Sequence, residues 1–484
     1  MSVAEKLTAV ADAIREQTGD PAKLTLDDMP DAIRSLFNQI VVTATGETIV
    51  LTDSANAYLK GLNIYGKTTQ NGAPTPEAPV ELVSAGDDGT VDVSVYGKNL
   101  FLHDAAGDAL IPNSYPIVNG KVLSVLDNGG VIVQGNDETS NGSNAYANGW
   151  YRPSNSGKNG NPNASKAAWL TAGSVVTVSA DVTVLEYSYG NSVNIGTYLY
   201  PYFTGNSYTY YNNYSVGEKN KVQQTYTITE TDFYFPVITL NSAKVKIENI
   251  QIELSSTATA YEPYKVQTLS VSTPNGLPGI PVSADGNYID SNGQQWVCDE
   301  VDFARGVYVQ RVEKVELTGQ GNWIAYSNSG RGVVNSFRRR FENMVDGKTM
   351  DGAKKYSVLS NYFQYGGYIG MDVPTSIGVS ESKYIYFRFD GENDTIKTTQ
   401  QFTEWLANKK TENIPVIVKY VLETPIETPL SAEQLAAYAS LRTNYPNTTI
   451  LNDDGAGMAL SYVASTKNYI DNQVAAVSAA ILNL

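Results

Sequence analysis

The sequence predicts a mainly β, multidomain protein with two antiparallel β-sandwich modules of jelly-roll type, a short helical N-terminal anchor and a C-terminal helix. Its 484 residues exceed the length that one hydrophobic core normally supports, so several domains are expected. Charged residues make up only 17% of the chain, and the abundance of Gly, Asn, Ser, Thr and Tyr is typical of short strands joined by turns. Segments such as Val91–Val95 alternate apolar and polar residues, which buries one face of a strand.

Residues 1–40 form the predicted helical anchor. Val3, Leu7, Val10 and Ile14 follow 4-3-4 spacing, and Ser2 precedes them as a candidate helix cap. Helices this short cannot build a stable core alone, so they are expected to dock on another protein or on a second copy of the chain.

Residues 41–98 are predicted to form a small β domain with a Pro-rich connector. Its strands are expected at Val41–Thr45, Ile49–Leu51, Leu62–Tyr65 and Val91–Val95. Proline has no N–H to donate to a sheet, so the segment containing Pro74, Pro76 and Pro79 should be extended and lie outside any central strand.

Residues 99–264 are predicted to form the first sandwich. Short β-rich runs separated by turn signals favour antiparallel pairing. The expected strands are Lys121–Leu126, Val131–Gln134, Ser174–Val184, Gly196–Phe203, Gln223–Ile228 and Lys244–Leu254. The closing strand and the following Ala260–Tyr264 resemble the last strand of jelly-roll carbohydrate-binding modules.

The remaining chain divides into three predicted parts. Residues 265–310 are expected to be a β connector, and residues 311–425 a second sandwich containing a helix at Gln401–Asn408. Residues 426–484 should hold a helix that begins at Ser431, a strand, and a short heptad helix over Ile470–Leu484. That last helix fits either packing on its own domain or a small oligomer bundle.

Charge and cysteine content exclude several classes of protein. A net charge of −16 argues against a nucleic-acid groove, and Arg338–Arg340 is interpreted as a solvated strand edge or interface contact rather than a phosphate site. Cys298 is the single cysteine, so no intrachain disulfide can form, and a small buried side chain is expected there. The sequence shows no signal peptide and no apolar run of the roughly 20 residues that a membrane span needs. We therefore expect synthesis in the cytoplasm and no membrane contact.

No catalytic residue, metal site or cofactor is predicted. His103 is the only histidine, and zinc-protease, nucleophile-elbow and P-loop patterns are absent. A pair of carboxylates for glycoside hydrolysis remains open, because its members can lie far apart in the sequence. Nothing selects two from the considered set of Asp53, Glu186, Glu253, Asp299 and Glu404. Gly86–Gly89 and Asn452–Gly455 are read as turns rather than calcium loops.

Aromatic residues beside asparagines give the candidate ligand site. An aromatic plane covers the apolar face of a sugar while amides bind its hydroxyls. The predicted glycan contacts are Trp150, Tyr151, Tyr200, Tyr202, Tyr208, Tyr210 and Tyr211. The alternative is that these tyrosines line a core or a subunit contact. Weaker candidates in the second sandwich are Trp323, Tyr362, Phe363 and Tyr365.

Four segments carry a resemblance to a known class of protein. They are LKGLNIYGKTTQNGAPTPEAPVELVS (Leu59–Ser84), VDVSVYGKNLF (Val91–Phe101), IENIQIELSSTATAYEPYK (Ile247–Lys265) and IPVIVKYVLETPIETPL (Ile414–Leu430). Together they resemble minor structural proteins, of receptor-binding or upper-baseplate type, at the tail tip of long-tailed phages or prophage-derived tails of Gram-positive hosts.

The resemblance implies a non-enzymatic virion protein that is commonly trimeric. It would contact other tail or baseplate proteins through residues 1–40 and attach the particle to a host surface glycan. The alternatives are a glycan depolymerase on the tail, a baseplate scaffold without a ligand, and a bacterial surface adhesin, against which the missing signal peptide counts.

Overall fold

A computed structural model describes most of the chain between residues 41 and 465. The described ranges are 41–51, 54–102, 109–112, 121–127, 129–135, 143–147, 168–170, 172–187, 195–200, 214–241, 243–328, 333–346, 358–370, 372–389, 396–444, 448–452 and 455–465. The predicted N-terminal helices and the Ile470–Leu484 heptad lie outside these ranges.

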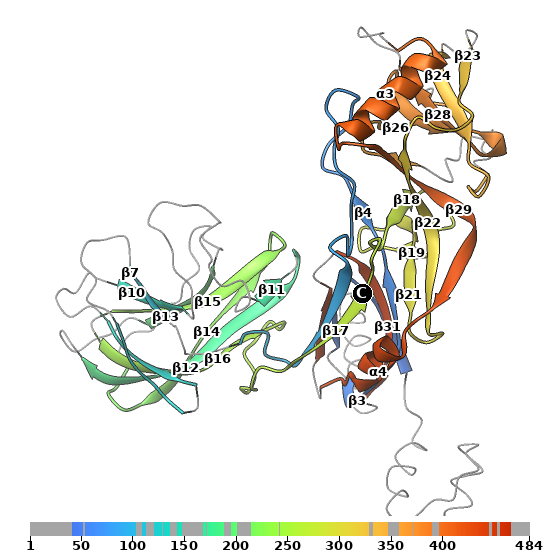
Figure 1. Ribbon diagram of the computed structural model, residues 1–484. Coiled ribbons are helices and arrows are strands. Elements are labelled where there is room, and N and C mark those ends of the chain that lie inside the picture. Colours follow the sequence, from blue (N-terminus) through green and yellow to red (C-terminus); the bar gives the residue numbers. More distant parts are fainter. Residues whose placement is uncertain are drawn as a thin grey trace, which may run out of the picture.

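The described residues form three β-rich lobes, which Figure 1 shows as a central module between two others. This arrangement confirms the predicted mainly β, multidomain fold class. Each lobe has its own hydrophobic cluster, because each is built from strands whose alternate residues face inward.

The central module is a sandwich of two antiparallel sheets. The larger sheet has the order β1 (Val41–Gly46), β31 (Gly457–Ala464), β3 (Ser54–Tyr65), β21 (Glu300–Asp302), β22 (Val307–Leu317), β29 (Val416–Pro429) and β25 (Leu359–Ser360). The smaller sheet has the order β17 (Val266–Ser272), β6 (Thr90–Tyr96), β30 (Thr448–Asn452) and β2 (Thr48–Leu51). Ile49, Leu62, Val93, Leu269 and Leu460 meet in the core between the sheets.

This core joins segments that are far apart in the sequence. Residues of the predicted small β domain, of the predicted connector 265–310 and of the C-terminal region share the two sheets. Alternation in the sequence shows which face of a strand is buried, but it does not show which other strand lies beside it.

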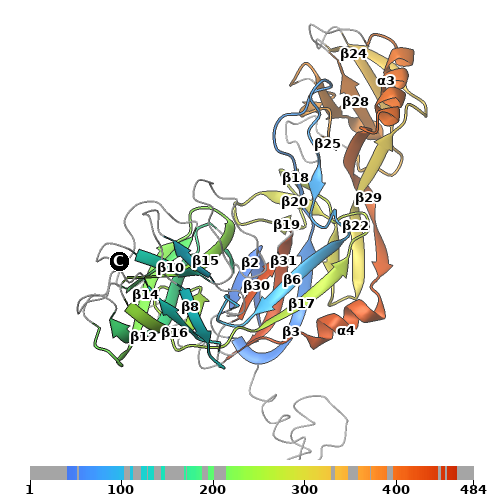
Figure 2. The same ribbon diagram turned by 60° about the vertical axis from the view of Figure 1, so that its left-hand side comes forward.

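The first module is inserted between β6 and β17. The chain leaves at Gly97 and returns at Lys265, and the Gly97 N–H donates to the Lys265 carbonyl at 3.0 Å. One sheet has the order β14 (Lys219–Thr227), β12 (Val175–Tyr187), β16 (Ala243–Glu253), β9 (Val131–Gln134) and β8 (Lys121–Val125). The other has the order β11 (Ala168–Leu170), β15 (Asp232–Asn241), β10 (Ser143–Ala147) and β7 (Ala109–Pro112), with β13 (Ile195–Tyr200) also on β15. Figure 2 shows the two sheets facing each other, as the sequence predicted.

The Asn99 side chain links the segment that enters the first module to the segment that leaves it. Its amide nitrogen donates to the carbonyls of Ile250 and Glu262, each at 3.2 Å. Its oxygen accepts the N–H groups of Phe101 at 3.0 Å and Ile252 at 3.2 Å. Asn99 lies in the segment Val91–Phe101, and three of its partners lie in the segment Ile247–Lys265. These two segments, which resemble tail proteins, therefore hold the first module to the central module.

The second module is inserted between β22 and β29, which run continuously from the central module into it. Its five-stranded sheet has the order β23 (Ile324–Asn328), β24 (Val333–Arg340), β28 (Tyr384–Arg388), β27 (Ser376–Val379) and β26 (Tyr365–Tyr368). Helix α3 (Thr399–Thr411) begins with a capping box between Thr398 and Gln401 and buries Phe402 and Leu406. The predicted helix at Gln401–Asn408 is confirmed, and it packs on one face of this sheet.

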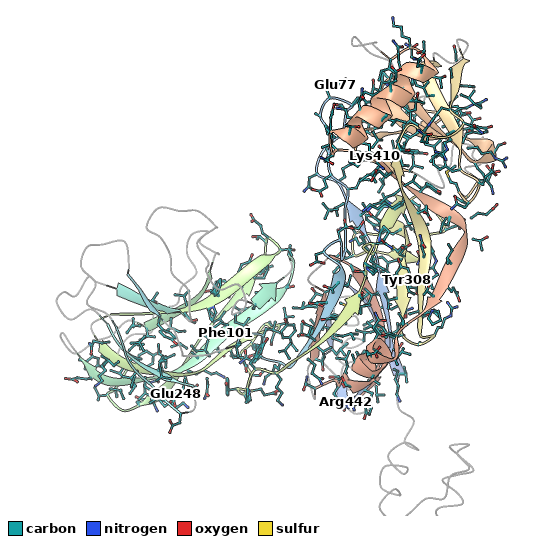
Figure 3. All side chains as sticks on the ribbon, in the orientation of Figure 1. Glu77, Phe101, Glu248, Tyr308, Lys410 and Arg442 are labelled. Carbon is teal, nitrogen blue, oxygen red and sulfur yellow. The ribbon has the colours of Figure 1, made fainter. Side chains whose placement is uncertain are left out.

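Smaller elements connect the central and second modules. They are β4 (Thr68–Thr69), β5 (Val83–Ser84), β18 (Gly279–Val282), β19 (Tyr288–Ile289) and β20 (Gln295–Cys298). The Pro-rich connector docks on the second module, since the Val80 N–H donates to the Asn361 carbonyl at 2.8 Å. Figure 3 shows Glu77 of this connector at the level of α3. Helix α4 (Ala432–Ser440), with the predicted Ser431–Gln434 capping box, covers one end of the central module.

Candidate functional sites

Most of the predicted glycan contacts cannot be placed. Trp150, Tyr151, Tyr202, Tyr208, Tyr210 and Tyr211 lie outside the described residues. Tyr200 ends β13, where its backbone pairs with Phe235. The ligand site on the first module therefore stays a prediction.

Several other aromatic residues of the two outer modules prove to be core residues. Tyr146 is fully buried, and Tyr214 is almost so, within the hydrophobic cluster of the first module. Trp323, Tyr362 and Phe363 are buried in the cluster of the second module, where Phe363 and Phe402 both pack on Phe387. Trp323, Tyr362 and Phe363 were thus wrong as ligand contacts, because these rings face α3 rather than solvent, whereas Tyr365 is only partly buried and stays a prediction.

The interpretation of Arg338–Arg340 as a solvated strand edge was wrong for Arg338, which has a strand on both sides, and the alternative of an interface contact stays a prediction. These residues end β24, which pairs with β23 on one side and β28 on the other. Successive side chains of a strand point to opposite faces, so Arg338 and Arg339 separate. Arg339 lies over the rings of Trp323 and Phe341 on the α3 side, whereas Arg338 lies on the opposite face.

That opposite face carries a row of tyrosines around Arg338, here called the Tyr–Arg face. Its members are Ile324, Tyr326, Arg338, Tyr368, Tyr384 and Tyr386. The Arg338 Cζ atom lies 4.8 Å from the ring centre of Tyr326, 4.6 Å from that of Tyr384 and 5.6 Å from that of Tyr386. An Arg338 Nη1–H also donates to the Tyr386 hydroxyl at 2.8 Å. Three strands therefore hold one guanidinium against aromatic rings.

The Tyr–Arg face is accessible along part of its area. Tyr326, Arg338 and Tyr384 are half-buried, and Ile324 is 44% exposed. Within the described residues, its apolar cluster contains only side chains of this sheet and of Ile369, directly after β26. Stacked guanidinium and tyrosine groups lose little side-chain freedom when a ligand binds, so the face is a rigid platform for planar or anionic groups.

The structure does not bring the four described members of the carboxylate set together. Glu186 and Glu253 belong to the first module, Glu404 lies on α3 and Asp299 lies in the central module, while Asp53 is outside the described residues. Glu253 accepts bonds from Gln251 at 2.8 Å and from the Thr259 hydroxyl at 2.7 Å, which fixes the turn after β16. The four described carboxylates thus lie in separate parts of the fold and do not pair with one another.

Asp299 is a buried carboxyl group with a perturbed pKa. It is 1% exposed, and burial raises its pKa to about 6 against the opposing effect of its hydrogen bonds. One oxygen accepts the N–H groups of Arg311 and Val312, each at 2.7 Å, and the other accepts the Tyr308 hydroxyl. The β22–β29 register shifts between Gln310 and Val312, so Asp299 satisfies the N–H groups of a β-bulge.

Asp299 forms part of the wall of a cleft of about 790 Å³ in the central module. One side of the cleft is β17 with the turn that follows it, and the other side is β22, β29 and the start of α4. The lining comprises Ser270, Val271, Ser272, Thr273, Pro274, Asn275, Gly276, Pro278, Asp299, Val301, Tyr308, Gln310, Val312, Glu313, Lys314, Thr428, Pro429, Leu430, Ser431 and Gln434. Figure 3 shows Tyr308 in this region, between α4 and the second module.

Lys419, in β29, also has a perturbed pKa. It is 1% exposed, and burial lowers its pKa to about 8. Its ammonium donates to the Ser84 hydroxyl, and its partner across the β22–β29 ladder is Lys314. Ser84 is itself buried and shares a hydrogen bond with Thr68, so this pair fastens β5 to β29.

The predicted character of Cys298 is confirmed. Its thiol is buried at the end of β20, and burial raises its pKa. The described residues contain no group of three His, Cys, Asp or Glu side chains suited to a metal ion. In that part of the chain, no helix has both the length and the apolar surface that crossing a membrane requires.

No protein-family model matches the chain, and no curated protein matches it. Among solved structures, it is similar to the CBM22-1 xylan-binding domain of Paenibacillus barcinonensis Xyn10C, with 11% identity and a TM-score of 0.20, covering 34% of this chain and 94% of that one. It is also similar to the tripod (BppUct-A-L) from the baseplate of bacteriophage Tuc2009, with 15% identity, a TM-score of 0.18, and coverage of 52% and 90%. For tailspike protein 4 of bacteriophage CBA120, the identity is 8%, the TM-score 0.21, and the coverage 32% and 20%. TM-scores of this size carry no inference about what the chain binds.

Proposed function

We propose that this protein is a structural and adhesive component of a phage tail tip or baseplate that attaches the particle to a host surface glycan through a β-sandwich module. Support comes from the resemblance of four sequence segments to such proteins and from the modular β architecture. The observation that carries the adhesive part is the Tyr–Arg face of the second module, which is one sheet covered by α3 rather than the predicted second sandwich.

The chemistry of the Tyr–Arg face suits a saccharide. Tyr384 offers a ring face for the C–H surface of a sugar, and its hydroxyl can bind the edge of that sugar. Arg338 adds a fixed positive charge within a chain of net charge −16, which favours an anionic substituent on the glycan. Such a shallow site binds weakly, and several copies in one particle would raise the overall affinity.

The remaining parts of the proposal concern assembly. Residues 1–40 would bind other tail proteins, the chain would form a homotrimer, and its location would be the virion. Light scattering on the purified full-length chain tests the trimer directly. A monomer at micromolar concentration that also remains a monomer in isolated particles would contradict it.

Binding to Gram-positive cell walls and to an array of neutral and anionic glycans tests the adhesive role. Arg338→Ala and Tyr384→Ala should each weaken binding by about tenfold or more, equivalent to about 1.4 kcal/mol. Arg442→Ala is the matched control, because Arg442 also stacks on a tyrosine, Tyr58, but in the central module. We expect that control to bind within about twofold of the wild type.

Two results would count against the proposal. If both variants on the Tyr–Arg face bind as the wild type does, this face is not the glycan contact. We also propose that the protein binds without hydrolysis, so release of reducing ends from a bound polysaccharide would instead identify a depolymerase.

A further inference from the structure

The two sheets of the central module differ in width, and this leaves part of one edge strand uncovered. β17 ends the four-stranded sheet, while β22 and β29 of the seven-stranded sheet continue beyond it. The cleft described above lies in this step, with Ser270 and Ser272 on one side and Tyr308, Gln310 and Thr428 on the other. A further strand of the smaller sheet would occupy the same place.

The register of β17 shows which backbone groups face the cleft. Gly97 donates to Lys265, and Thr273 donates to the Gly89 carbonyl at 2.8 Å, so odd-numbered residues of β17 bond to β6. In an antiparallel pair, the intervening residues point their N–H and C=O groups the opposite way. Ser270 and Ser272 therefore direct two donors and two acceptors toward the open edge.

Both ends of the open edge are closed by the protein itself. At one end, the Gln267 side-chain amide donates to the Ser440 carbonyl at 3.4 Å and accepts the Arg442 N–H at 2.9 Å. At the other end, Gly276 donates to the Thr273 carbonyl at 2.8 Å and the chain turns away. Five residues of β17 lie between these stops at Gln267 and Thr273, so an extended segment of roughly five residues fits there.

The lining restricts the chemistry of an occupant. Its charged members are Asp299, Glu313 and Lys314. Asp299 is already bonded to three donors, and the adjacent Glu313 and Lys314 have opposite charges. Tyr308 is the one aromatic residue in this described lining, and its hydroxyl is bonded to Asp299, so the cleft does not present the aromatic plane that a sugar would need.

We infer that the cleft beside β17 binds an extended, uncharged polypeptide segment from another protein, which adds to the sheet as a strand. Ser270 and Ser272 supply the main-chain hydrogen bonds, and the small apolar walls, such as Pro274 and Val312, accept alternate side chains of the segment. This site is separate from the Tyr–Arg face and does not depend on glycan binding.

The test uses the full-length chain and the uncharged probe peptide acetyl-Thr-Val-Ser-Val-Thr-amide. Amide hydrogen exchange of Ser270 and Ser272 is followed while the peptide is titrated to about 10 mM. A peptide strand should slow exchange of these two amides by about tenfold or more at saturation. The peptide acetyl-Glu-Val-Glu-Val-Glu-amide, which has the same length, should slow it far less.

Two variants remove the site by different routes. Ser270→Pro deletes an outward N–H without deleting a bond to β6, and proline is tolerated at such edge positions. Thr428→Trp fills the cleft from the opposite wall without altering β17. Each should weaken peptide binding at least about fivefold, whereas Ser270→Ala, which keeps the backbone N–H, should bind within about twofold of the wild type.

Three outcomes would overturn the inference. The first is unchanged exchange of Ser270 and Ser272 at the highest peptide concentration. The second is unchanged peptide binding by a folded Thr428→Trp variant. The third is equal protection of these amides by a neutral tetrasaccharide such as cellotetraose, which would make the cleft a sugar site instead.

Discussion

The Tyr308 hydroxyl donates a hydrogen bond to the Asp299 carboxylate in the wall of the central cleft. The same carboxylate holds two N–H groups of the bulge in β22. Asp299 thus fixes both the wall of the cleft and the point where β22 turns toward the second module.

Replacing Asp299 by Asn should remove a pH dependence of stability. Because the folded pKa of about 6 lies above the usual value of 3.8, the folded state holds the proton more tightly. The resulting stabilisation is complete below about pH 4 and is lost as the pH rises through 6, by about 3 kcal/mol. Unfolding free energies of the central module, measured by hydrogen exchange at pH 4 and pH 7, should show the variant gaining that amount relative to the wild type. An equal change in unfolding free energy between pH 4 and pH 7 for the two proteins would contradict this.

Lys419→Met should act in a different pH window. The folded pKa of about 8 lies below the usual 10.5, so the unfolded state binds the proton more tightly between these values. Wild-type stability should therefore rise by about 3 kcal/mol from pH 8 to pH 10.5 through this group, and the variant should lack that rise. Urea unfolding at pH 7.5 and pH 10 measures it, and Lys410→Met, on the exposed side of α3, is the control.

Asn99→Ala should destabilise the first module by about 2–4 kcal/mol. The substitution leaves two carbonyls and two N–H groups without their side-chain partner in a buried site. Asn220→Ala is a suitable control, because that amide makes one long bond, of 3.3 Å, to Glu218 and should cost less than about 0.5 kcal/mol. The melting temperatures of the two variants test this prediction. Equal values would show that the hydrogen bonds of the Asn99 side chain do not stabilise the first module.

The first module should be removable without unfolding its base. Gly97 and Lys265 form a hydrogen-bonded pair of an antiparallel ladder, and a two-residue Asn-Gly turn joins such a pair without strain. A chain in which Asn-Gly replaces residues 98–264 should keep the central module folded, with protected amides in β6 and β17. Loss of amide protection in β6 and β17 would show that the central module needs the first module in order to fold.

Replacing both Trp150 and Tyr151 by Ala tests the site predicted on the first module. If these residues contact the glycan, cell-wall binding should fall by about tenfold while the melting temperature changes little. A binding loss in the Arg338→Ala variant without one in this double variant would assign the ligand to the second module.

The sequence predicted helices and strands better than it predicted which strands pair with each other. The Ser431–Gln434 capping box marked the start of α4, and alternation marked Val91–Val95 as a strand. It did not show that this strand lies between β17 and β30, because pairing depends on contacts across hundreds of residues. Likewise, Arg338 and Tyr386 are 48 positions apart, and nothing local indicates that they share a sheet face.

Both outer modules are insertions, and this has a mechanical consequence. Force applied to either one reaches the central module through two covalent crossings side by side, at Gly97 and Lys265 for one arm and along β22 and β29 for the other. Each crossing carries only part of the load, and neither arm can swing on a single flexible link. If the protein attaches a particle as proposed, that attachment would thus resist twisting and shear.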